Sequence, residues 1–287
     1  MPTGATEFVD SITADVFIPE IWYPGAIVAR EDELVFARLV DRHFESHLRM
    51  GDKLNIPNIS NLSARTKTKS NNSAITYETI TETNQQLEVA TWEYVAMAVE
   101  SIIDVQADRD LMVSYSGKLG QALGQAVDDV LAGLPDNVTN TVGTLATDLD
   151  DDDFIRARQY LNDANVPLGD RVIVVSPAQE AGMLKLDRFI HSDYAVIHGG
   201  ETDGLDRAYI GTFYRMPVYM SVNVEGTNGT GHDNTMFQRE AFALLMQMTP
   251  KMRSMYDIDF LVDKIAVEQL YGTKQIRGDH AVFMQGA

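Results

Sequence analysis

A stretch near the start of the chain, residues 49–91, most constrains the fold, because it predicts a long hairpin without a hydrophobic core of its own. Its outgoing arm, 53–59, and its return arm, 75–83, alternate apolar and polar residues with the period of a β-strand. The tip between them, 63–73, is polar apart from one alanine. A lone two-stranded ribbon is marginally stable in water. We therefore expect a partner outside the subunit to hold the hairpin, and the favoured partner is another copy of the same chain.

The charge of this hairpin is opposite to that of the chain as a whole. The whole chain carries a formal net charge of −19. Between residues 49 and 77, five basic residues stand against Asp52 alone, which gives a local net charge of +4. This contrast favours docking of a basic arm on the acidic body of another copy. A solvated basic loop and a loop that touches phosphate are the alternatives. The predicted contact residues are Arg49, Lys53, Arg65, Lys67 and Lys69.

The composition excludes several classes of function. The 287 residues include no cysteine, which excludes disulfides, thiolate catalysis and cysteine-ligated zinc. That absence fits a reducing cytoplasm or a particle assembled there. No apolar run approaches the roughly 18 residues of a membrane span. The acidic start of the chain lacks the basic and apolar regions of a signal peptide. We expect a protein with no membrane partner.

The first half of the chain predicts an arm, the hairpin and a long helix. Residues 1–30 are extended and interrupted by prolines, so we expect an arm that lies against another element. A helix is expected over 31–48, where three acidic residues precede a repeating apolar face. A strand is expected over 91–99. The longest helix is predicted over 106–131, because apolar residues recur there every three or four positions.

The second half of the chain predicts an α/β region that follows a polar linker, 137–147. A stretch rich in Gly, Asn and Thr, 225–234, is expected to form a surface loop. Helices are predicted over 154–164 and 177–186. The predicted strands cover 171–175, 209–213, 218–222, 241–248, 260–275 and 281–284.

Two clusters have the residue types of a metal site. A calcium loop at Asp148–Asp153 would need a glycine turn and a distant glutamate, and both are missing. Aspartates before a helix are explained by capping and by the helix dipole. His43 and His47 have a spacing that could bind zinc. The glutamate between them is misplaced for a metalloprotease, and no third ligand is evident. We expect no metal.

Other motifs predict no catalytic or cofactor site. His191 and His198 flank Asp193, but no serine occupies a nucleophile elbow nearby. The glycine-rich run 226–231 lacks the Gly-Lys-Ser/Thr that holds phosphate and magnesium. We therefore expect neither an enzyme nor a bound cofactor.

The order of the predicted elements resembles the major capsid proteins of tailed bacteriophages. The likeness extends over nearly the whole chain. No single motif is specific for the family, but their order and spacing together are. The segments that carry the likeness are Ile18–Trp22 with Glu33–Val40, Gly51–Pro57, Asp104–Asp108 with Ala126–Asp129, Arg171–Pro177, Ile210–Phe213 with Pro217–Ser221, and Tyr271–Lys274.

The resemblance implies an α+β fold, the tailed-phage major capsid protein fold that herpesvirus capsid floor domains and encapsulins share. Under this resemblance, residues 1–48 form an N-terminal arm and helix, and 49–91 form an extended hairpin loop. A peripheral domain with the spine helix comprises 92–147 plus 249–287. The α/β axial domain comprises 148–248.

The resemblance also implies the partners. Copies of the chain would form hexamers and pentamers of an icosahedral shell around double-stranded DNA, bound without sequence specificity. The product would be a virion capsid assembled in the host cytoplasm, with portal, scaffolding and decoration proteins as further partners. In relatives the extended loop lies over an adjacent subunit, and some relatives crosslink a loop lysine to a neighbouring asparagine. Residues with suitable chemistry are Lys67, Lys69, Asn71 and Asn72, although no residue-level match supports a crosslink.

Two other functions compete with a phage capsid. An encapsulin-like compartment shell shares the fold, but its extended loop is usually shorter and no long arm precedes it. An oligomeric hydrolase would use His191, His198 and the Asp148–Asp153 cluster. The first alternative predicts protein cargo in purified particles, and the second predicts measurable turnover.

Overall fold

The computed structural model describes most of the chain. The chain divides into two units, Met1–Glu31 and Asp32–Ala287, and the described residues belong to the second. The predicted arm over residues 1–30 therefore lies outside the described residues. The described ranges are 34–47, 50–59, 62–67, 74–75, 77–80, 82–100, 111–186, 208–227 and 230–286.

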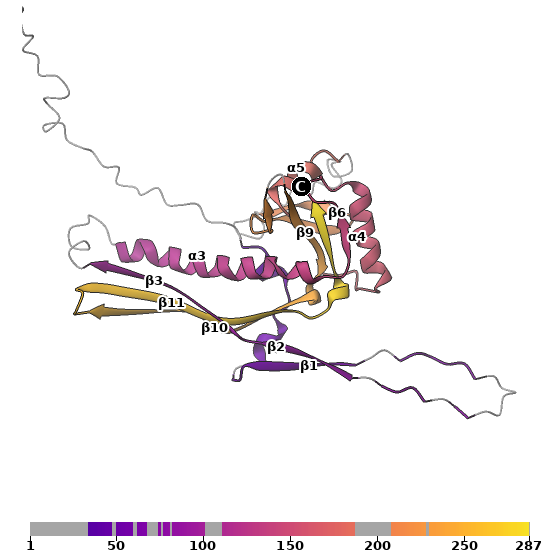
Figure 1. Cartoon of the computed structure of the whole chain (residues 1–287), viewed down its shortest axis with the longest axis horizontal. Helices are drawn as coiled ribbons and strands as arrows, with labels where there is room; N and C mark the ends of the chain where they lie inside the picture. Colours follow the sequence, from indigo (N-terminus) through magenta and orange to yellow (C-terminus); the bar gives the residue numbers. More distant parts are fainter. Residues whose placement is uncertain are drawn as a thin grey trace, which may run out of the picture. The chain divides into compact units, whose positions relative to one another are not determined.

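The described strands form three sheets, which Figure 1 shows together with the helices. A two-stranded antiparallel sheet pairs β1 (Lys53–Ile59) with β2 (Glu82–Glu88). A three-stranded antiparallel sheet has the order β10-β11-β3, and a seven-stranded sheet has the order β4-β12-β9-β5-β7-β6, with β8 paired to β9. The other strands are β3 (Thr91–Glu100), β4 (Thr141–Gly143), β5 (Arg171–Val175), β6 (Tyr209–Phe213), β7 (Met216–Met220), β8 (Gly226–Thr227), β9 (Gly231–Gln238), β10 (Phe242–Asp257), β11 (Val262–Gln275) and β12 (Ala281–Gly286).

The long helix α3 (Leu111–Ala132) packs on one face of the three-stranded sheet. Leu119 and Leu123 of α3 are buried with Ile265 and Val267 of β11. The buried stripe is offset from the expected one: Leu119 belongs to both, whereas Ala122 and Val130 of the expected stripe are exposed. The predicted start of the helix, residues 106–110, lies outside the described residues. The other helices and 3-10 turns are α1 (Phe36–Leu39), η2 (His43–Ser46), η3 (Leu134–Asn137), α4 (Asp151–Asp163), α5 (Pro177–Met183), η4 (Arg239–Ala241) and η5 (Gly278–His280).

The seven-stranded sheet is covered on both faces, and its central strand β5 shows why. All five residues of β5 are buried. Val172 and Val174 belong to a core that includes Leu131 of α3, whereas Ile173 and Val175 belong to a core that includes side chains of α4 and α5. A strand buried on both faces is apolar almost throughout. This composition explains why β5 was predicted from sequence with its observed bounds.

The seven-stranded sheet also draws strands from distant parts of the sequence. β12 pairs antiparallel with β9 and parallel with β4. Both β4 and β12 come from ranges that the sequence analysis assigned to the peripheral domain, whereas β9 comes from the axial range. The division into peripheral and axial domains stays a prediction.

The prediction of one helix over 31–48 is wrong for its described part. The helical residues there are the single turn α1 and the 3-10 turn η2. Between them the backbone of Asp41 joins β10: its N–H donates to the carbonyl of Phe242, and its carbonyl accepts from the N–H of Leu244, each at 3.0 Å. An isolated parallel bridge to Ala243 results. This pairing interrupts the helix despite its apolar periodicity.

The prediction of a surface loop over 225–234 is wrong for the strand residues 226–227 and 231–234, although 225–227 and 230 are exposed. β8 and the first half of β9 occupy its described part, and β9 lies between β12 and β5 in the seven-stranded sheet. Asn234 is fully buried, and its Oδ1 accepts a hydrogen bond from the N–H of Ser176 at 2.7 Å. Asn234, one of the polar residues that indicated a loop, therefore has a hydrogen-bond partner in the protein interior.

Several other predictions hold with small shifts at the element ends. β6 has the predicted bounds, and β10 continues to Asp257 instead of ending at 248. α4 begins at Asp151, three residues before the prediction. None of the described helices combines the length and hydrophobicity that crossing a lipid bilayer requires.

Candidate assembly surface

The root of the extended loop, residues 50–59 and 82–89, packs against strands β10 and β11 of its own subunit. β1 and β2 pair in register from Lys53↔Glu88 to Ile59↔Glu82. Leu87 is fully buried and packs in one cluster with Ala243 and Leu245 of β10. Apolar burial of one leucine contributes about 1.5–3 kcal/mol. The root therefore has the core contact that an isolated ribbon lacks.

A close backbone approach and polar contacts reinforce the root. A Cβ on Gly272 of β11 would lie 2.1 Å from the carbonyl oxygen of Glu88, so only glycine permits this approach. Lys274 Nζ donates to the carbonyl of Gln86 at 2.7 Å, and Gln247 Nε2 donates to the carbonyl of Gly51 at 2.8 Å. The root is thus joined to both strands of the β10–β11 hairpin.

The outer part of the extended loop, residues 60–81, differs from the root. Its described residues form no regular secondary structure, so the predicted strand over 75–83 is wrong for residues 77–80. Among the described residues, the ladder extends to the pair Ile59↔Glu82, and the described residues of the outer part are exposed. One contact joins the arms there: the N–H and Oγ of Ser63 donate to the carboxylate of Glu78, each at 3.0 Å.

Apolar side chains of the outer part are exposed. Tyr77 is 83% exposed and Leu62 is 64% exposed. Ile75 and Ile80 are also more than half exposed. Apolar side chains gathered on a loop without a core are a common mark of an interaction site.

The structure describes three of the five predicted contact residues. Arg65 and Lys67 are exposed in the tip of the loop. Lys53 lies in the root, where its Nζ is 3.6 Å from a carboxylate oxygen of Glu88. Arg49 and Lys69 lie outside the described residues. Contact between these basic residues and another copy stays a prediction.

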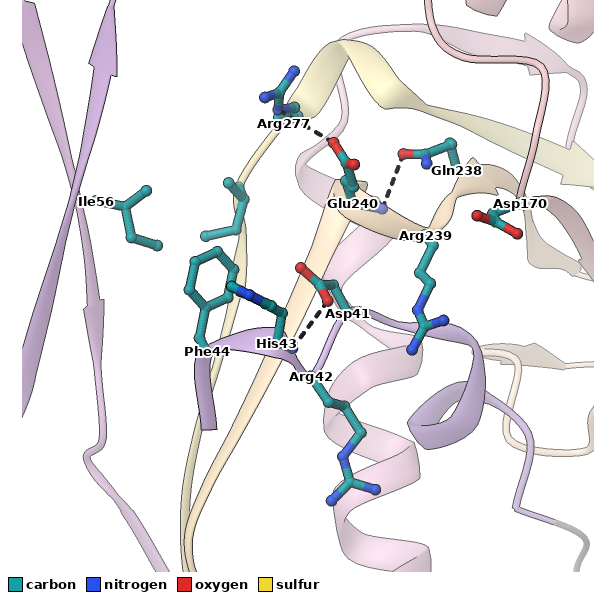
Figure 2. A pocket seen from close by; sticks show the side chains of 11 residues that line it. Asp41, Arg42, His43, Phe44, Ile56, Asp170, Gln238, Arg239, Glu240 and Arg277 are labelled. Carbon is teal, nitrogen blue, oxygen red and sulfur yellow. Dashed lines mark hydrogen bonds and ion pairs between the residues drawn. The ribbon is translucent and has the colours of Figure 1, made fainter. Parts of the chain in front are cut away.

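A pocket lies beside the root, between β1 and the turns η2 and η4 (Figure 2). Both basic and acidic side chains line the pocket, and Arg277 Nε lies 4.0 Å from the carboxylate of Glu240. The carboxylate of Asp41 also accepts a hydrogen bond from the backbone N–H of His43 at 3.0 Å. No serine, threonine, cysteine or lysine lines it, so the described pocket offers no nucleophile of these types. The lining residues are Asp41, Arg42, His43, Phe44, Ile56, Asp170, Gln238, Arg239, Glu240, Ile276 and Arg277.

A buried aspartate on α3, which the sequence analysis did not single out, fixes the chain just after the predicted arm. Asp128 is fully buried and accepts hydrogen bonds from the N–H groups of Val35 and Ala37 and from Asn223 Nδ2, at 3.2, 2.9 and 3.1 Å. Burial raises the pKa of Asp128, while the three hydrogen bonds oppose that shift. Its partners Val35 and Ala37 are distant in sequence, so no local pattern indicates this role.

Three carboxylates gather near the end of α3. Ligand oxygens of Asp136, Glu225 and Asp233 lie within 4.8 Å of one another. Burial, and then the neighbouring carboxylate of Asp136, raise the pKa values of Glu225 and Asp233. The oxygens could approach a cation, but exposed acidic groups such as Asp136 and Glu225 are common without one.

The described parts of the other candidate sites have structural roles. Asp150 caps α4: its side chain accepts from the N–H of Asp153 at 2.9 Å, in a reciprocal capping box. The capping interpretation of the aspartate cluster is confirmed. His43 and His47 are exposed near η2, with ring centroids 5.3 Å apart. His191 and His198 lie outside the described residues.

The extended loop, the long helix α3 on the three-stranded sheet and the seven-stranded α/β sheet together form a fold that solved phage structures share. A solved structure from Mycobacterium phage Che8 matches with a TM-score of 0.78 and 24% identity, covering 93% of this chain and 97% of that chain. The capsid structure of cyanophage P-SCSP1u matches with a TM-score of 0.72 and 14% identity, covering 96% and 94%. The mature capsid of bacteriophage PhiM1 matches with a TM-score of 0.68 and 13% identity, covering 93% and 91%.

The comparison of the sequence with family models leads to the same kind of protein as the comparison of structures. The model of a family described as phage capsid protein matches residues 63–279. The chain belongs to the phage capsid protein family, and its function is that of a major capsid protein. No curated protein matches the sequence. The predicted fold class and capsid function are confirmed, and the encapsulin alternative is not favoured.

Proposed function

We propose that the chain is the repeating unit of an icosahedral phage head, in which hexamers and pentamers are joined by the extended loop of each copy. The observation that carries this proposal is the contrast within one hairpin. The root is held by Leu87 and Gly272, whereas Tyr77 in the outer part is 83% exposed. The subunit therefore fixes the origin of the loop, and a second copy supplies the contacts of its outer part.

The charges support a second copy as the partner. Arg65 and Lys67 are exposed on the outer part, and the chain as a whole carries −19. Arg49 and Lys69 complete the basic set with Lys53 of the root. Opposite charge brings a loop toward the acidic body of a neighbour, while the apolar contacts hold it there. A stable contact should bury more than about 1,000 Å² per pair.

The same proposal covers the remaining partners and the location. The shell encloses double-stranded DNA without sequence specificity and is part of the virion, assembled in the host cytoplasm. Portal, scaffolding and decoration proteins are further partners of such a shell. The role of the chain is structural, without turnover.

Removal of residues 61–72 from the loop tests the proposal. We expect soluble subunits with the same thermal unfolding as the parent chain, because the root contacts remain, but no closed shells in negative-stain microscopy. Arg156→Glu on α4 provides the control for an exposed basic residue outside the loop, and it should assemble normally. Normal shells from the deletion variant would overturn the proposed role of the loop.

A further inference from the structure

The two outer edges of the three-stranded sheet differ in how well they are protected against pairing with a strand of another chain. On β10, Pro250 and Lys251 occupy the edge, and the register with β11 shifts between Met246 and Met248 and again between Met248 and Lys251. Prolines, lysines and bulges are the features that keep an edge strand from pairing with another chain. The β10 edge is therefore protected against pairing with another chain.

The β3 edge has none of these features. β3 pairs with β11 over its full length, from Thr91↔Tyr271 to Glu100↔Val262, without a shift in register. Its sequence includes no proline, lysine or arginine. Within the described ranges, β11 is the one strand paired with β3. A long, regular edge without proline, lysine or a bulge, in which Glu93 and Glu100 are the charged residues, is suited to accept a further strand.

The sheet face next to this edge is also open. Val95 and Met97 of β3 pack toward α3, so the alternate residues face away from the helix. Of these, Trp92 is 67% exposed and Tyr94 is 72% exposed. A groove continues beyond them along the same strand, lined by Ala96 and Ala98 of β3 with residues of β10 and β11.

The outer part of the extended loop supplies a segment of matching type. Residues 77–80, Tyr-Glu-Thr-Ile, include the strand-forming residues Tyr77, Thr79 and Ile80 but pair with no strand among the residues that the structure describes. The whole β1–β2 ladder separates them from β3, because β2 leads from Glu82 back to the root and β3 begins at Thr91. At about 3.3 Å per residue the seven ladder positions span roughly 23 Å, so the segment cannot reach β3 of its own subunit without opening the ladder.

We propose that the outer edge of β3 binds residues 77–80 of a second copy as an added strand. This inference rests on the proposed function and names where the loop docks. Backbone hydrogen bonds join the segment to the edge, and alternate side chains share one face. Tyr77 and Thr79 then lie on the face of Trp92 and Tyr94, where aromatic cross-strand pairs form.

The absence of cysteine makes a disulfide scan the direct test. Thr79→Cys chains are mixed in equal amounts with chains carrying Tyr94→Cys, Ala96→Cys or Ala98→Cys, assembled into shells and oxidised. A disulfide needs Cα atoms about 4.4–6.8 Å apart, so a strand added to β3 should link at least one pair into dimers on a non-reducing gel. Met252→Cys, on the exposed part of β10 and outside this groove, is the matched control and should remain unlinked.

The outcomes separate the two proposals. Failure of the unmodified chain to form shells would overturn the proposed function itself. Shells in which no β3 position links, or in which Met252→Cys links as well as the β3 positions, would overturn the docking site alone. Hydrogen exchange of the unmodified chain gives a second measurement: assembly should slow exchange in β3 at least tenfold more than in β10. Equal or reversed protection would contradict the inference.

Discussion

The root and the outer part of the extended loop belong to one hairpin, yet they differ in almost every physical respect. In the root, Leu87 is fully buried, and the backbone of Glu88 lies against Gly272. In the outer part, Tyr77 is exposed and the ladder has ended. The two parts have similar strand propensity, so propensity does not explain the difference. Packing of the root against β10 and β11 explains the difference, which agrees with the marginal stability of isolated ribbons.

The largest effect should follow from a change at Gly272 in the root. Gly272→Ala would bring a Cβ to 2.1 Å from a backbone oxygen, which cannot move without shifting the ladder. We expect a loss of about 2–4 kcal/mol in the free energy of unfolding, measured with urea. Gly120→Ala on α3 is the control, since nothing lies within 4 Å of its Cβ, and it should stabilise the subunit by about 0.5–1 kcal/mol. Equal effects of the two changes would contradict the close contact at the root.

A pair of truncations should separate folding from assembly. Leu87→Ala removes a fully buried side chain and should lower the free energy of unfolding by about 2–4 kcal/mol. Tyr77→Ala removes an exposed one and should change it by less than about 0.5 kcal/mol. We expect the Tyr77 variant to fold and yet to form fewer shells by sedimentation. A Tyr77 variant that unfolds as easily as the Leu87 variant would show that the outer part has contacts within its own subunit.

The contrast between root and outer part also explains what the sequence could predict. The alternation of β3 and β11 and the apolar stripe of α3 report contacts that repeat along an element, so a period in the sequence reveals them. Contacts made by single residues leave no period. Asp128 bonds to Val35 and Ala37 far away in the sequence, and only the fold brings them together.

The three failed element predictions have the same physical origin. Residues 31–48 have the periodicity of a helix, but the backbone of Asp41 pairs with β10. The polar residues before Thr235 resemble a loop, but Asn234 finds a buried hydrogen-bond partner in Ser176. In the outer part of the loop, the sequence indicated a strand that the isolated subunit does not pair. Each time, a tertiary partner or its absence decided against the local pattern.

Charge reversal in the outer part should reduce shell assembly less than truncation of its apolar side chains does. Arg65→Glu combined with Lys67→Glu and Lys69→Glu reverses the basic tip and should weaken assembly most at low salt, where screening is least. Shell yield by light scattering should recover toward the parent value as ionic strength rises. Lys251→Glu combined with Arg156→Glu changes two exposed basic residues outside the loop and is the control. A loss of assembly that does not change with salt would show that these charges have no electrostatic role.

The smallest expected effect is a pH-dependent change in thermal stability. It tests whether a change in the body of the subunit alters stability without altering assembly through the loop. The pKa values of Glu225 and Asp233 are raised, by burial first and then by the neighbouring carboxylate of Asp136. A carboxyl whose pKa is raised in the folded state contributes stability at low pH, and this contribution is lost as pH rises through the folded pKa. Glu225→Gln removes one charge from the trio and should therefore raise the melting temperature at pH 7 by about 1–3 °C, with a smaller change near pH 4. Shell yield should stay at the parent value, because the trio lies outside the loop. A variant that loses assembly while gaining thermal stability would instead place the trio at a contact between copies.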